Sequence, residues 1–139
     1  MVVVERSAPV VAPMRRRHLR GVVAIEQEAN PRPWSSRLFA GELRMPTSRV
    51  YRVALHEHEV VGYAGLMITL DEGHVTNVAV RPDHRRDQVA TRLLLVLLRE
   101  AVARGVTAVT LEVRMSNRGA QELYRRFGFA PGGVRPNYY

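Results

Sequence analysis

The sequence NVAVRPDHRRDQVATRLL, residues 77–94, contains the change of periodicity that decides the fold. Val78 and Val80 alternate with other residues as in a β-strand, and Pro82 ends this run. A short basic loop then leads into the leucine-rich segment 93–98, which is typical of a buried helix. The stretch therefore predicts a strand, a loop and a helix in direct succession.

The loop between this strand and this helix is a candidate anion site. A helix that begins directly after a loop presents free backbone N–H groups and the positive end of its dipole. Arg85, Arg86 and Arg92 lie near this helix start in the sequence. A phosphate or pyrophosphate fits such groups, but a basic surface turn before a buried helix has the same local pattern.

Composition narrows the class of protein. The 139 residues are 46% hydrophobic, which predicts one globular domain over residues 1–139. There is no cysteine, so disulfides, thiolate metal sites and a cysteine nucleophile are excluded. Neither a signal peptide nor a membrane span fits the short apolar runs, and we expect a cytoplasmic protein.

The net charge of +8 is carried by arginine alone, because the sequence has no lysine. Such a charge favours acidic partners, for example nucleic acid, ribosomal particles or a polyanionic cofactor such as coenzyme A. The arginines are scattered along the sequence, and no aromatic-rich RNA motif accompanies them. Specific nucleic-acid binding is therefore not expected.

Periodicity predicts a mixed α/β fold. Strands are expected at residues 8–13, 49–56, 60–70, 74–80 and 108–113, with a short strand after Phe129, and helices at residues 16–29, 35–45, 89–104 and 117–127. Tight turns join the strands from residue 49 to residue 80 into an antiparallel meander. The helix at 89–104 is a crossover, so the strand after it runs parallel to the strand before it.

Several local features have more than one interpretation. Trp34 is either a core anchor or part of an acceptor pocket before a short helix capped by Ser35. In that helix Leu38, Phe39 and Leu43 are expected to face inward. The run from His56 to Glu59 suggests a metal site, but consecutive residues of a strand point to opposite faces. We therefore interpret that run as a solvated turn and predict no metal.

Two polar residues in the second half interrupt apolar patterns. Glu112 lies in the predicted strand at 108–113, where a carboxylate costs free energy unless it is paired, solvated or used. It either faces the cleft beside the parallel strand or pairs with Arg114. Tyr124 lies on the apolar stripe of the last helix, where a tyrosine usually packs in the core with its hydroxyl on a carbonyl or water.

The loop after the decisive strand resembles the acyl-CoA loop of the GNAT superfamily of N-acetyltransferases. That family pattern is Arg or Gln, two residues, Gly, one residue, and then Gly or Ala. Arg85 and Ala90 match it, whereas Gln88 stands where the family has glycine. The resemblance implies a GNAT fold, with a mixed, mostly antiparallel sheet whose parallel strand pair is splayed at the acetyl-CoA site.

Further ordered matches resemble the bacterial ribosomal-protein alanine N-acetyltransferases of the RimI type. The matching segments are PWS (33–35), LDE (70–72), NVAV (77–80), LEVR (111–114), SN (116–117), LY (123–124), FGF (127–129) and RPNYY (135–139). The resemblance implies direct transfer of acetyl from acetyl-CoA to the N-terminal amino group of a protein. A ribosomal protein that begins with alanine is the acceptor it implies.

The same resemblance implies individual roles. Glu112 corresponds to the general base and Tyr124 to the general acid. The implied acetyl-CoA contacts are Val78, Ala79, Val80, Arg85, Arg86, Asp87, Gln88, Val89, Ala90, Thr91 and Asn117. The implied acceptor contacts are Pro33, Trp34, Tyr138 and Tyr139.

Two departures from the family pattern have consequences. A side chain at Gln88 costs about 1 kcal/mol if that position needs a positive φ, and weaker acetyl-CoA binding is expected. The family also continues past the paired tyrosines into a final strand that this sequence lacks. A short gene product, a strand supplied by a partner or truncation would each explain this. An unpaired sheet edge would favour dimerisation or aggregation, and we expect a monomer or a homodimer.

Two rival functions remain open at this point. An acetyltransferase for a small amine or an internal lysine shares the cofactor loop, and only the acceptor distinguishes it. A non-catalytic domain that binds coenzyme A or RNA through its arginines would bind without turnover. RNA binding of that kind would depend steeply on salt.

Overall fold

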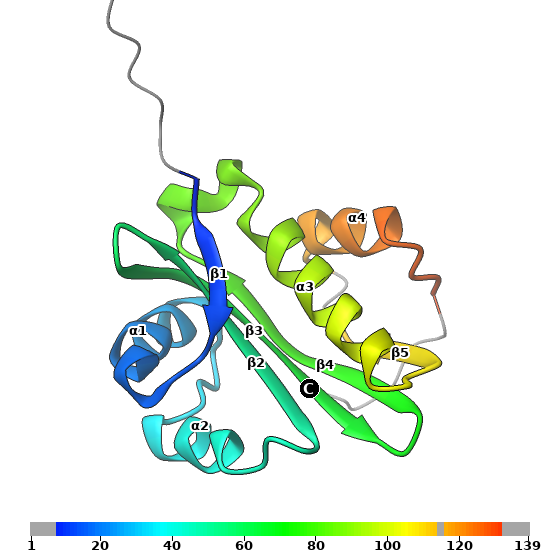
Figure 1. Ribbon diagram of the computed structural model, residues 1–139. Coiled ribbons are helices and arrows are strands. Elements are labelled where there is room, and N and C mark those ends of the chain that lie inside the picture. The colour runs from blue at the N-terminus through cyan, green and yellow to red at the C-terminus, as the bar shows by residue number, and fades with distance from the viewer. Residues whose placement is uncertain (1–7, 114–115, 132–139) are drawn as a thin grey trace, which may run out of the picture.

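The structure, a computed structural model, describes residues 8–113 and 116–131, except the side chains of residues 86 and 87. The strands are β1 (Val10–Pro13), β2 (Arg49–His56), β3 (Glu59–Thr69), β4 (Glu72–Val80) and β5 (Ala108–Leu111). The helices are α1 (Leu19–Ala29), α2 (Ser36–Leu43), α3 (Val89–Ala103) and α4 (Arg118–Arg126), with short 3₁₀ helices at Arg16–His18 and Pro82–Asp87. Figure 1 shows helices on both faces of one sheet.

The five strands form a single sheet in the order β1-β2-β3-β4-β5. The first four strands are antiparallel neighbours, and β5 pairs with β4 in parallel after the α3 crossover. The predicted mixed α/β fold, with its meander and its parallel pair, is confirmed. The hairpin between β2 and β3 turns at Glu57 and His58, which have φ values of 50° and 72°, as a two-residue hairpin turn requires.

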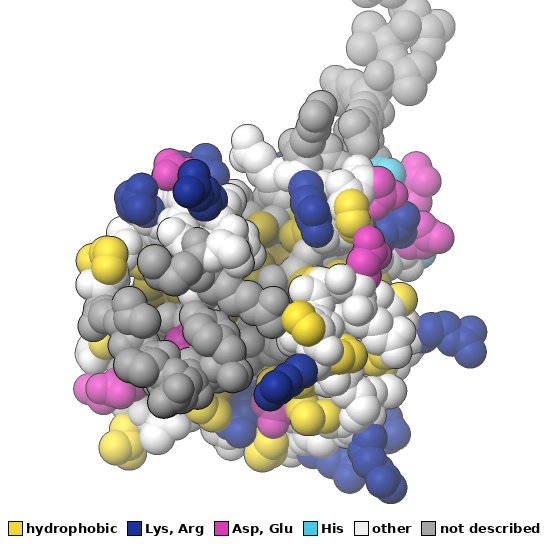
Figure 2. All heavy atoms as spheres, turned by 180° about the vertical axis from the view of Figure 1, so that it is seen from behind, with side chains coloured by type: hydrophobic (Ala, Val, Ile, Leu, Met, Phe, Trp, Pro, Cys, Tyr) yellow, Lys and Arg dark blue, Asp and Glu magenta, His cyan; other side chains and the backbone are white. Residues whose placement is uncertain are grey.

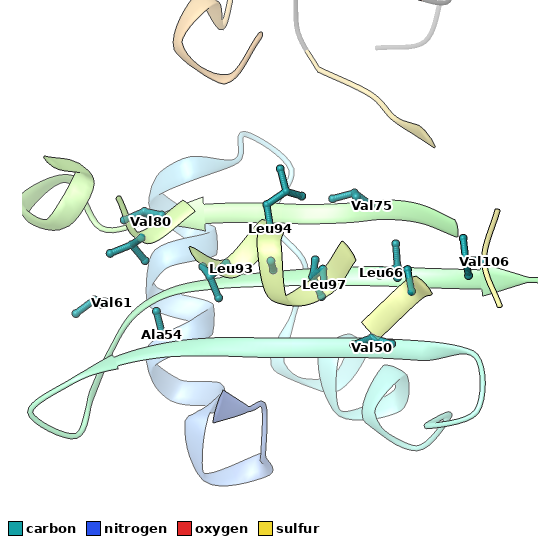
Figure 3. Close-up of a cluster of buried hydrophobic side chains, with 13 residues drawn as sticks. Val50, Ala54, Val61, Leu66, Val75, Val80, Leu93, Leu94, Leu97 and Val106 are labelled. Carbon is teal, nitrogen blue, oxygen red and sulfur yellow. The ribbon is translucent and has the colours of Figure 1, made fainter. Parts of the chain in front are cut away.

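Two hydrophobic clusters hold the layers together, one on each face of the sheet. The larger cluster lies between the sheet and α3, and Figure 3 shows Leu93, Leu94 and Leu97 of α3 among the side chains of the strands, which include Val50 and Leu66. The second cluster joins α1 and α2 to the opposite face through Val22, Phe39, Tyr51 and Tyr63. Both clusters come from the apolar periodicity of the sequence, because each helix buries one stripe and each central strand buries both faces.

Local capping residues set three helix ends where the sequence predicts them. The Ser35 hydroxyl accepts a hydrogen bond from the Leu38 N–H at 3.1 Å and begins α2. Gly105 and Gly128, with φ values of 85° and 93°, follow the last residues of α3 and α4. The inward orientation expected for Leu38 is wrong, because its side chain is 42% exposed and Phe39 alone fills the core at that turn.

Element boundaries differ from prediction at several ends. The strand expected at residues 108–113 ends at Leu111, and the first turn expected of the helix at 16–29 is a 3₁₀ helix. Residues 129–131 form no strand, and the rest of the predicted final strand lies outside the described residues. Within the described segments, no helix has the length and apolarity needed to cross a membrane.

Candidate active site

The pairing of the parallel strands β4 and β5 ends about halfway along β4, and we call this point the split. Their pairing runs from Glu72 opposite Ala108 to Val75 opposite Leu111 and then stops. From residue 76 to residue 80, β4 pairs only with β3 among the described strands. Backbone N–H and C=O groups on the outer edge of this segment therefore have no strand partner among the described residues, which suits a ligand that lies along the strand. The predicted parallel pair is confirmed, whereas its role as the acetyl-CoA site stays a prediction.

A β-bulge lies where the two strands separate. Gly65 pairs with Asn77 while Leu66 pairs with Val75, so Thr76 is the extra residue of β4. The Oδ1 atom of Asn77 is buried and accepts no hydrogen bond from any described residue. An unpaired buried acceptor costs free energy unless a ligand or water satisfies it, so Asn77 is a candidate contact that sequence reasoning missed. A polar residue amid the apolar alternation of β4 was the available signal.

The loop from β4 to α3 has the geometry that its predicted role needs. Gln88 adopts a left-handed conformation with φ 55° and ψ 33°, which confirms that the family glycine position requires a positive φ. Val89, Ala90 and Thr91 follow as the first turn of α3, and this turn contains no acidic residue. Their free N–H groups and the positive helix end favour an anion here.

The arginines around this loop have different partners. Arg85 is exposed, and the side chains of Arg86 and Asp87 lie outside the description. Arg92 was expected at the anion site, but its Nη1 atom donates a hydrogen bond to the carbonyl of Pro9 at 3.1 Å. Within the described part of the loop, Arg85 and the backbone N–H groups thus remain as candidate anion contacts.

Glu112 is the first residue after β5, so it follows the point at which the two strands separate. The half-buried strand position expected for it is wrong, because β5 ends one residue earlier and the side chain is exposed. The sequence pattern could not reveal this, since the apolar run continues through Val113 while the pairing stops at Leu111. The side chain of Glu112 is thus exposed to solvent next to the point where the pairing of β4 and β5 ends.

Tyr124 on α4 is half-buried and packs against the larger hydrophobic cluster, which contains Leu94 of α3. Val78 of β4 and Leu111 of β5 pack against the same cluster. The ring centroid of Tyr124 lies 6.0 Å from that of Phe129 in an edge arrangement. Burial raises the pKa of Tyr124 above the usual tyrosine value, because the phenolate would lose solvation. The hydroxyl is therefore protonated at neutral pH and able to donate.

Asn117 begins α4 as its N-cap. Its Oδ1 atom accepts a hydrogen bond from the Ala120 N–H at 3.1 Å. This helix cap was not anticipated for a residue expected to contact the cofactor. Because Oδ1 is engaged in the cap, the amide Nδ2 group is the part of Asn117 left for such a contact.

The loop between α1 and α2 is tied to the sheet by a buried glutamate. Glu26 is only 2% exposed, and its Oε2 atom accepts hydrogen bonds from the Trp34 backbone N–H at 2.9 Å and from Asn30 Nδ2 at 3.2 Å. Its Oε1 atom accepts a hydrogen bond from the Tyr63 hydroxyl. Trp34 is half-buried with its ring 5.3 Å from Phe39, so it does anchor the core, while the neighbouring Pro33 is exposed.

A second buried tyrosine connects α2 to the bulge of β4. The Tyr51 hydroxyl donates a hydrogen bond to Glu42 Oε1 at 2.8 Å and lies 3.4 Å from Thr76 Oγ1. Arg49 Nε donates to the same glutamate oxygen at 2.9 Å, which compensates its charge. Tyr51 and Tyr63 occupy neighbouring strands, and Tyr63 is directly opposite Ala79 of β4. Sequence reasoning missed both networks, because each joins residues far apart in the chain.

The expected acceptor contacts are only partly described. Pro33 and Trp34 lie in the loop between α1 and α2, whereas Tyr138 and Tyr139 are outside the described residues. Among the described side chains, no group of three or more His, Asp or Glu residues is placed to hold a metal ion. The described part of the candidate site thus offers the outer edge of β4, the N-terminus of α3, the carboxylate of Glu112 and the protonated hydroxyl of Tyr124.

These features are the ones expected of a coenzyme A-dependent acyltransferase, because an open strand edge suits an extended cofactor and a helix start suits its pyrophosphate. The model of the acetyltransferase (GNAT) family matches residues 19–129, and the chain belongs to this family. The resemblance found in the sequence is thereby confirmed. The protein is an acetyl-CoA-dependent N-acetyltransferase.

Two relatives and one solved structure similar to this chain are named for acetylation of an alanine of ribosomal protein S18. A Bacillus subtilis (strain 168) relative, assigned as a ribosomal protein bS18-alanine N-acetyltransferase, is 32% identical over 96% of this chain and 89% of its own length. The Escherichia coli (strain K12) ribosomal protein bS18-alanine N-acetyltransferase is 37% identical over 83% and 76% of the two chains. The crystal structure of the Escherichia coli ribosomal-protein-S18-alanine N-acetyltransferase covers 94% of this chain and 83% of its own, with a TM-score of 0.84 and 32% identity.

The described residues fit acetyl-CoA. The β4 segment after Val75 has an open edge for the pantetheine amides, and the buried Oδ1 of Asn77 lacks a partner within the described chain. The first turn of α3 follows a left-handed residue and carries no acidic side chain that would repel a pyrophosphate. Bound acetyl-CoA supplies an acetyl group activated as a thioester.

Proposed function

We propose that this protein acetylates the N-terminal α-amino group of a ribosomal protein whose first residue is alanine. The named activity of the relatives in Bacillus subtilis and Escherichia coli supports this acceptor. Identity of 32% over 134 residues, almost the whole chain, makes a shared acceptor class the simplest inference. A ribosomal acceptor also leads us to expect that the reaction takes place in the cytoplasm. We expect the protein to be a single domain that acts as a monomer or a homodimer.

One observation carries the proposal: Glu112 directly follows the strand that separates from β4 at Val75. The cofactor's acetyl end is expected along β4 at Val78, Ala79 and Val80, beside this point. An amine that enters between the strands would therefore meet an accessible carboxylate and the open strand edge together.

Glu112 is proposed to act as the general base. An N-terminal ammonium has a pKa of about 7.7–8.0, so a carboxylate can remove its proton at modest cost, directly or through one water. Because the Glu112 side chain is exposed, water can carry this proton between them. The deprotonated amine is then the nucleophile that attacks the thioester. Because the chain has no cysteine that could carry the acetyl group, we expect direct transfer from acetyl-CoA to the amine.

Tyr124 is proposed to act as the general acid. Its raised pKa keeps the hydroxyl hydrogen in place at neutral pH, so Oη can give that proton to the departing thiolate. Backbone N–H groups on the open edge of β4 are suited to stabilise the negative charge that develops on the carbonyl oxygen. The contacts proposed for the pyrophosphate are Arg85, Arg86, Asp87, Gln88, Val89, Ala90 and Thr91, with Asn117 as a further cofactor contact.

Pro33 and Trp34 are proposed to shape the acceptor side, together with Tyr138 and Tyr139. The Trp34 backbone N–H is held by Glu26, which fixes the loop that presents Pro33 to solvent. A loop fixed in this way costs little ordering entropy when an acceptor binds.

The test is acetyl transfer to a peptide that begins with alanine. Thiol released during the reaction can be followed with a thiol reagent without background, because the protein contains no cysteine. Matched peptides would carry a blocked N-terminus with one internal lysine, or a free amine on a small molecule. Transfer to the free alanine peptide alone is expected.

Transfer to the lysine peptide or to the small amine instead would replace the proposed acceptor. Binding of acetyl-CoA without transfer to any of the three would contradict the proposal in favour of a non-catalytic domain. Because the protein has no lysine, acetylation of its own side-chain amines cannot obscure either result.

A further inference from the structure

The outer surfaces of α1 and α2 enclose a groove that the proposed reaction does not use. The groove has a volume of about 1090 Å³. It is lined by Arg16, Leu19, Arg20, Val23, Ala24, Gln27, Ser36, Arg37, Ala40, Gly41 and Arg44. α1 and α2 pack on the face of the sheet opposite α3, so the groove lies across the sheet from the pyrophosphate loop.

The groove is strongly basic. Its lining includes four arginines, two before or on α1 and two on or after α2, and no acidic side chain. All four are exposed, and none of them forms an ion pair with a residue in the described part of the chain. By contrast, Arg49, Arg81 and Arg104 elsewhere on the molecule each pair with a carboxylate. The positive charge of the groove is therefore left for a partner.

The basic surface extends beyond the groove. A smaller hollow of about 190 Å³ adjoins it, shares Arg16 and Arg44, and adds Arg15. The pKa of the nearby His18 is lowered first by burial and then by repulsion from Arg17 and Arg15, as expected where positive charge is not compensated. In Figure 2, arginine side chains gather at the lower right, on the side of the molecule that carries α1 and α2 in that view.

The lining also indicates how an anionic partner would be held. Small residues, Ala24, Ala40 and Gly41, lie between the arginines, and the groove has no aromatic side chain on which a base could stack. Guanidinium groups bind phosphates through paired, charge-assisted hydrogen bonds. Such a surface contacts a backbone and carries no base-specific readout.

We propose that the groove between α1 and α2 binds the sugar-phosphate backbone of RNA without reading its sequence. The choice of RNA among polyanions rests on the proposed function, since a ribosomal protein acceptor assembles together with RNA. The arginines are scattered in the sequence, and only the packing of α1 beside α2 brings them together. RNA held there would keep the enzyme near such an acceptor while leaving the split between β4 and β5 open.

The test measures binding of a fluorescent single-stranded RNA of about 16 nucleotides at salt concentrations between about 50 and 200 mM. The groove variant is Arg20→Gln with Arg37→Gln. The matched control is Arg99→Gln with Arg126→Gln, which removes the same charge from exposed positions on α3 and α4. We expect about tenfold weaker binding for the groove variant and a salt slope reduced by about 1.4, because each lost phosphate contact removes about 0.7.

The control variant should bind RNA like the unmodified protein. An equal loss in both variants would overturn the proposal, because net charge alone would then explain binding. A polyglutamate peptide of equal charge that binds as tightly as RNA, with the same dependence on Arg20 and Arg37, would overturn it in favour of an acidic protein partner. No binding of RNA would overturn it as well.

The two proposals fail separately. The groove variant should acetylate the alanine peptide at the unmodified rate, since neither substitution touches the split between β4 and β5. A protein that binds RNA through Arg20 and Arg37 but acetylates no N-terminal peptide would refute the proposed acceptor and leave the groove assignment standing. Normal peptide acetylation without RNA binding would refute the groove assignment alone.

Discussion

Tyr63 of β3 donates its hydroxyl hydrogen to the carboxylate of Glu26 on α1, inside the second hydrophobic cluster. The same carboxylate accepts hydrogen bonds from the Trp34 backbone and from Asn30, so one buried side chain joins the sheet, a helix and the loop after it. Burial, and then the hydrogen bond to Glu26, raise the pKa of Tyr63 above its usual range. The loop between α1 and α2, which is proposed to meet the acceptor, is therefore held in place by the buried Glu26 side chain.

Glu26→Ala should lower the free energy of unfolding by about 2–4 kcal/mol, because three donors would lose a buried charged acceptor. Urea unfolding measures this. The matched control is Glu28→Ala, an exposed glutamate on the same helix, with an expected change within about 0.5 kcal/mol. For the milder variant Tyr63→Phe, we expect a raised KM for the alanine peptide with an unchanged KM for acetyl-CoA. An equal rise in both constants would contradict a role in positioning this loop.

Gln88→Gly should lower the Kd for acetyl-CoA by about fivefold, or about 1 kcal/mol. The residue already has a left-handed backbone with φ 55°, so the gain comes from closer approach of the backbone to the pyrophosphate. Calorimetric titration measures the change. Gln88→Ala serves as the control, since it removes most of the side chain but retains Cβ, and its Kd should stay near that of the unmodified protein. An unchanged Kd in Gln88→Gly would show that the side chain does not obstruct the cofactor.

Glu112→Gln should reduce kcat/KM for the alanine peptide by about 100-fold or more at pH 7, because general base catalysis is worth about 10²–10⁴. The deficit should shrink above about pH 8, where the acceptor amine is already deprotonated. A pH profile of both proteins measures this. Glu122→Gln on the exposed side of α4 is the control and should retain the normal profile. A constant deficit from pH 6 to pH 9 would argue against proton removal by Glu112.

Tyr124→Phe should reduce kcat by about 100-fold while the Kd for acetyl-CoA stays the same, because only the transferable proton is lost. Burial raises the pKa of Tyr124, so its protonated form is favoured in the folded protein. The contribution of Tyr124 to the free energy of unfolding is therefore complete below the ordinary tyrosine pKa of about 10 and decreases as pH rises beyond it. The activity should therefore show no alkaline loss from this group below about pH 10. A loss centred near pH 8 that is absent from the variant would contradict the assignment.

Gly65→Ala should lower the free energy of unfolding by about 1–3 kcal/mol. A Cβ atom at Gly65 would collide with the buried ring of Tyr51 and lie 2.7 Å from Thr76 Oγ1, at the bulge where β4 leaves β5. Thermal unfolding measures the effect. Gly41→Ala is the matched control, because nothing lies within 4 Å of its added Cβ and alanine favours the helix by about 0.5–1 kcal/mol. Equal stability of Gly65→Ala and the unmodified protein would show that the bulge can shift.

Sequence alone determined the elements and their order. Apolar periodicity and turn residues located β2 with its correct bounds, and Ser35, Gly105 and Gly128 marked helix ends, because capping and backbone conformation depend on neighbouring residues. The parallel direction of β5 also followed, since a right-handed crossover helix allows only that arrangement. The family also followed from sequence, because its motifs are short local segments that can be compared without the fold.

Tertiary structure decided the features that depend on residues far apart in the chain. The end of β5 at Leu111 follows from where its pairing with Val75 stops, and no local pattern records that register. The hydrogen bond between Glu26 and Tyr63, which are 37 residues apart, and the basic groove between α1 and α2 arise only when helices pack on the sheet. Side-chain contacts of this kind are set by the packing of whole elements, whereas local sequence sets only the elements themselves.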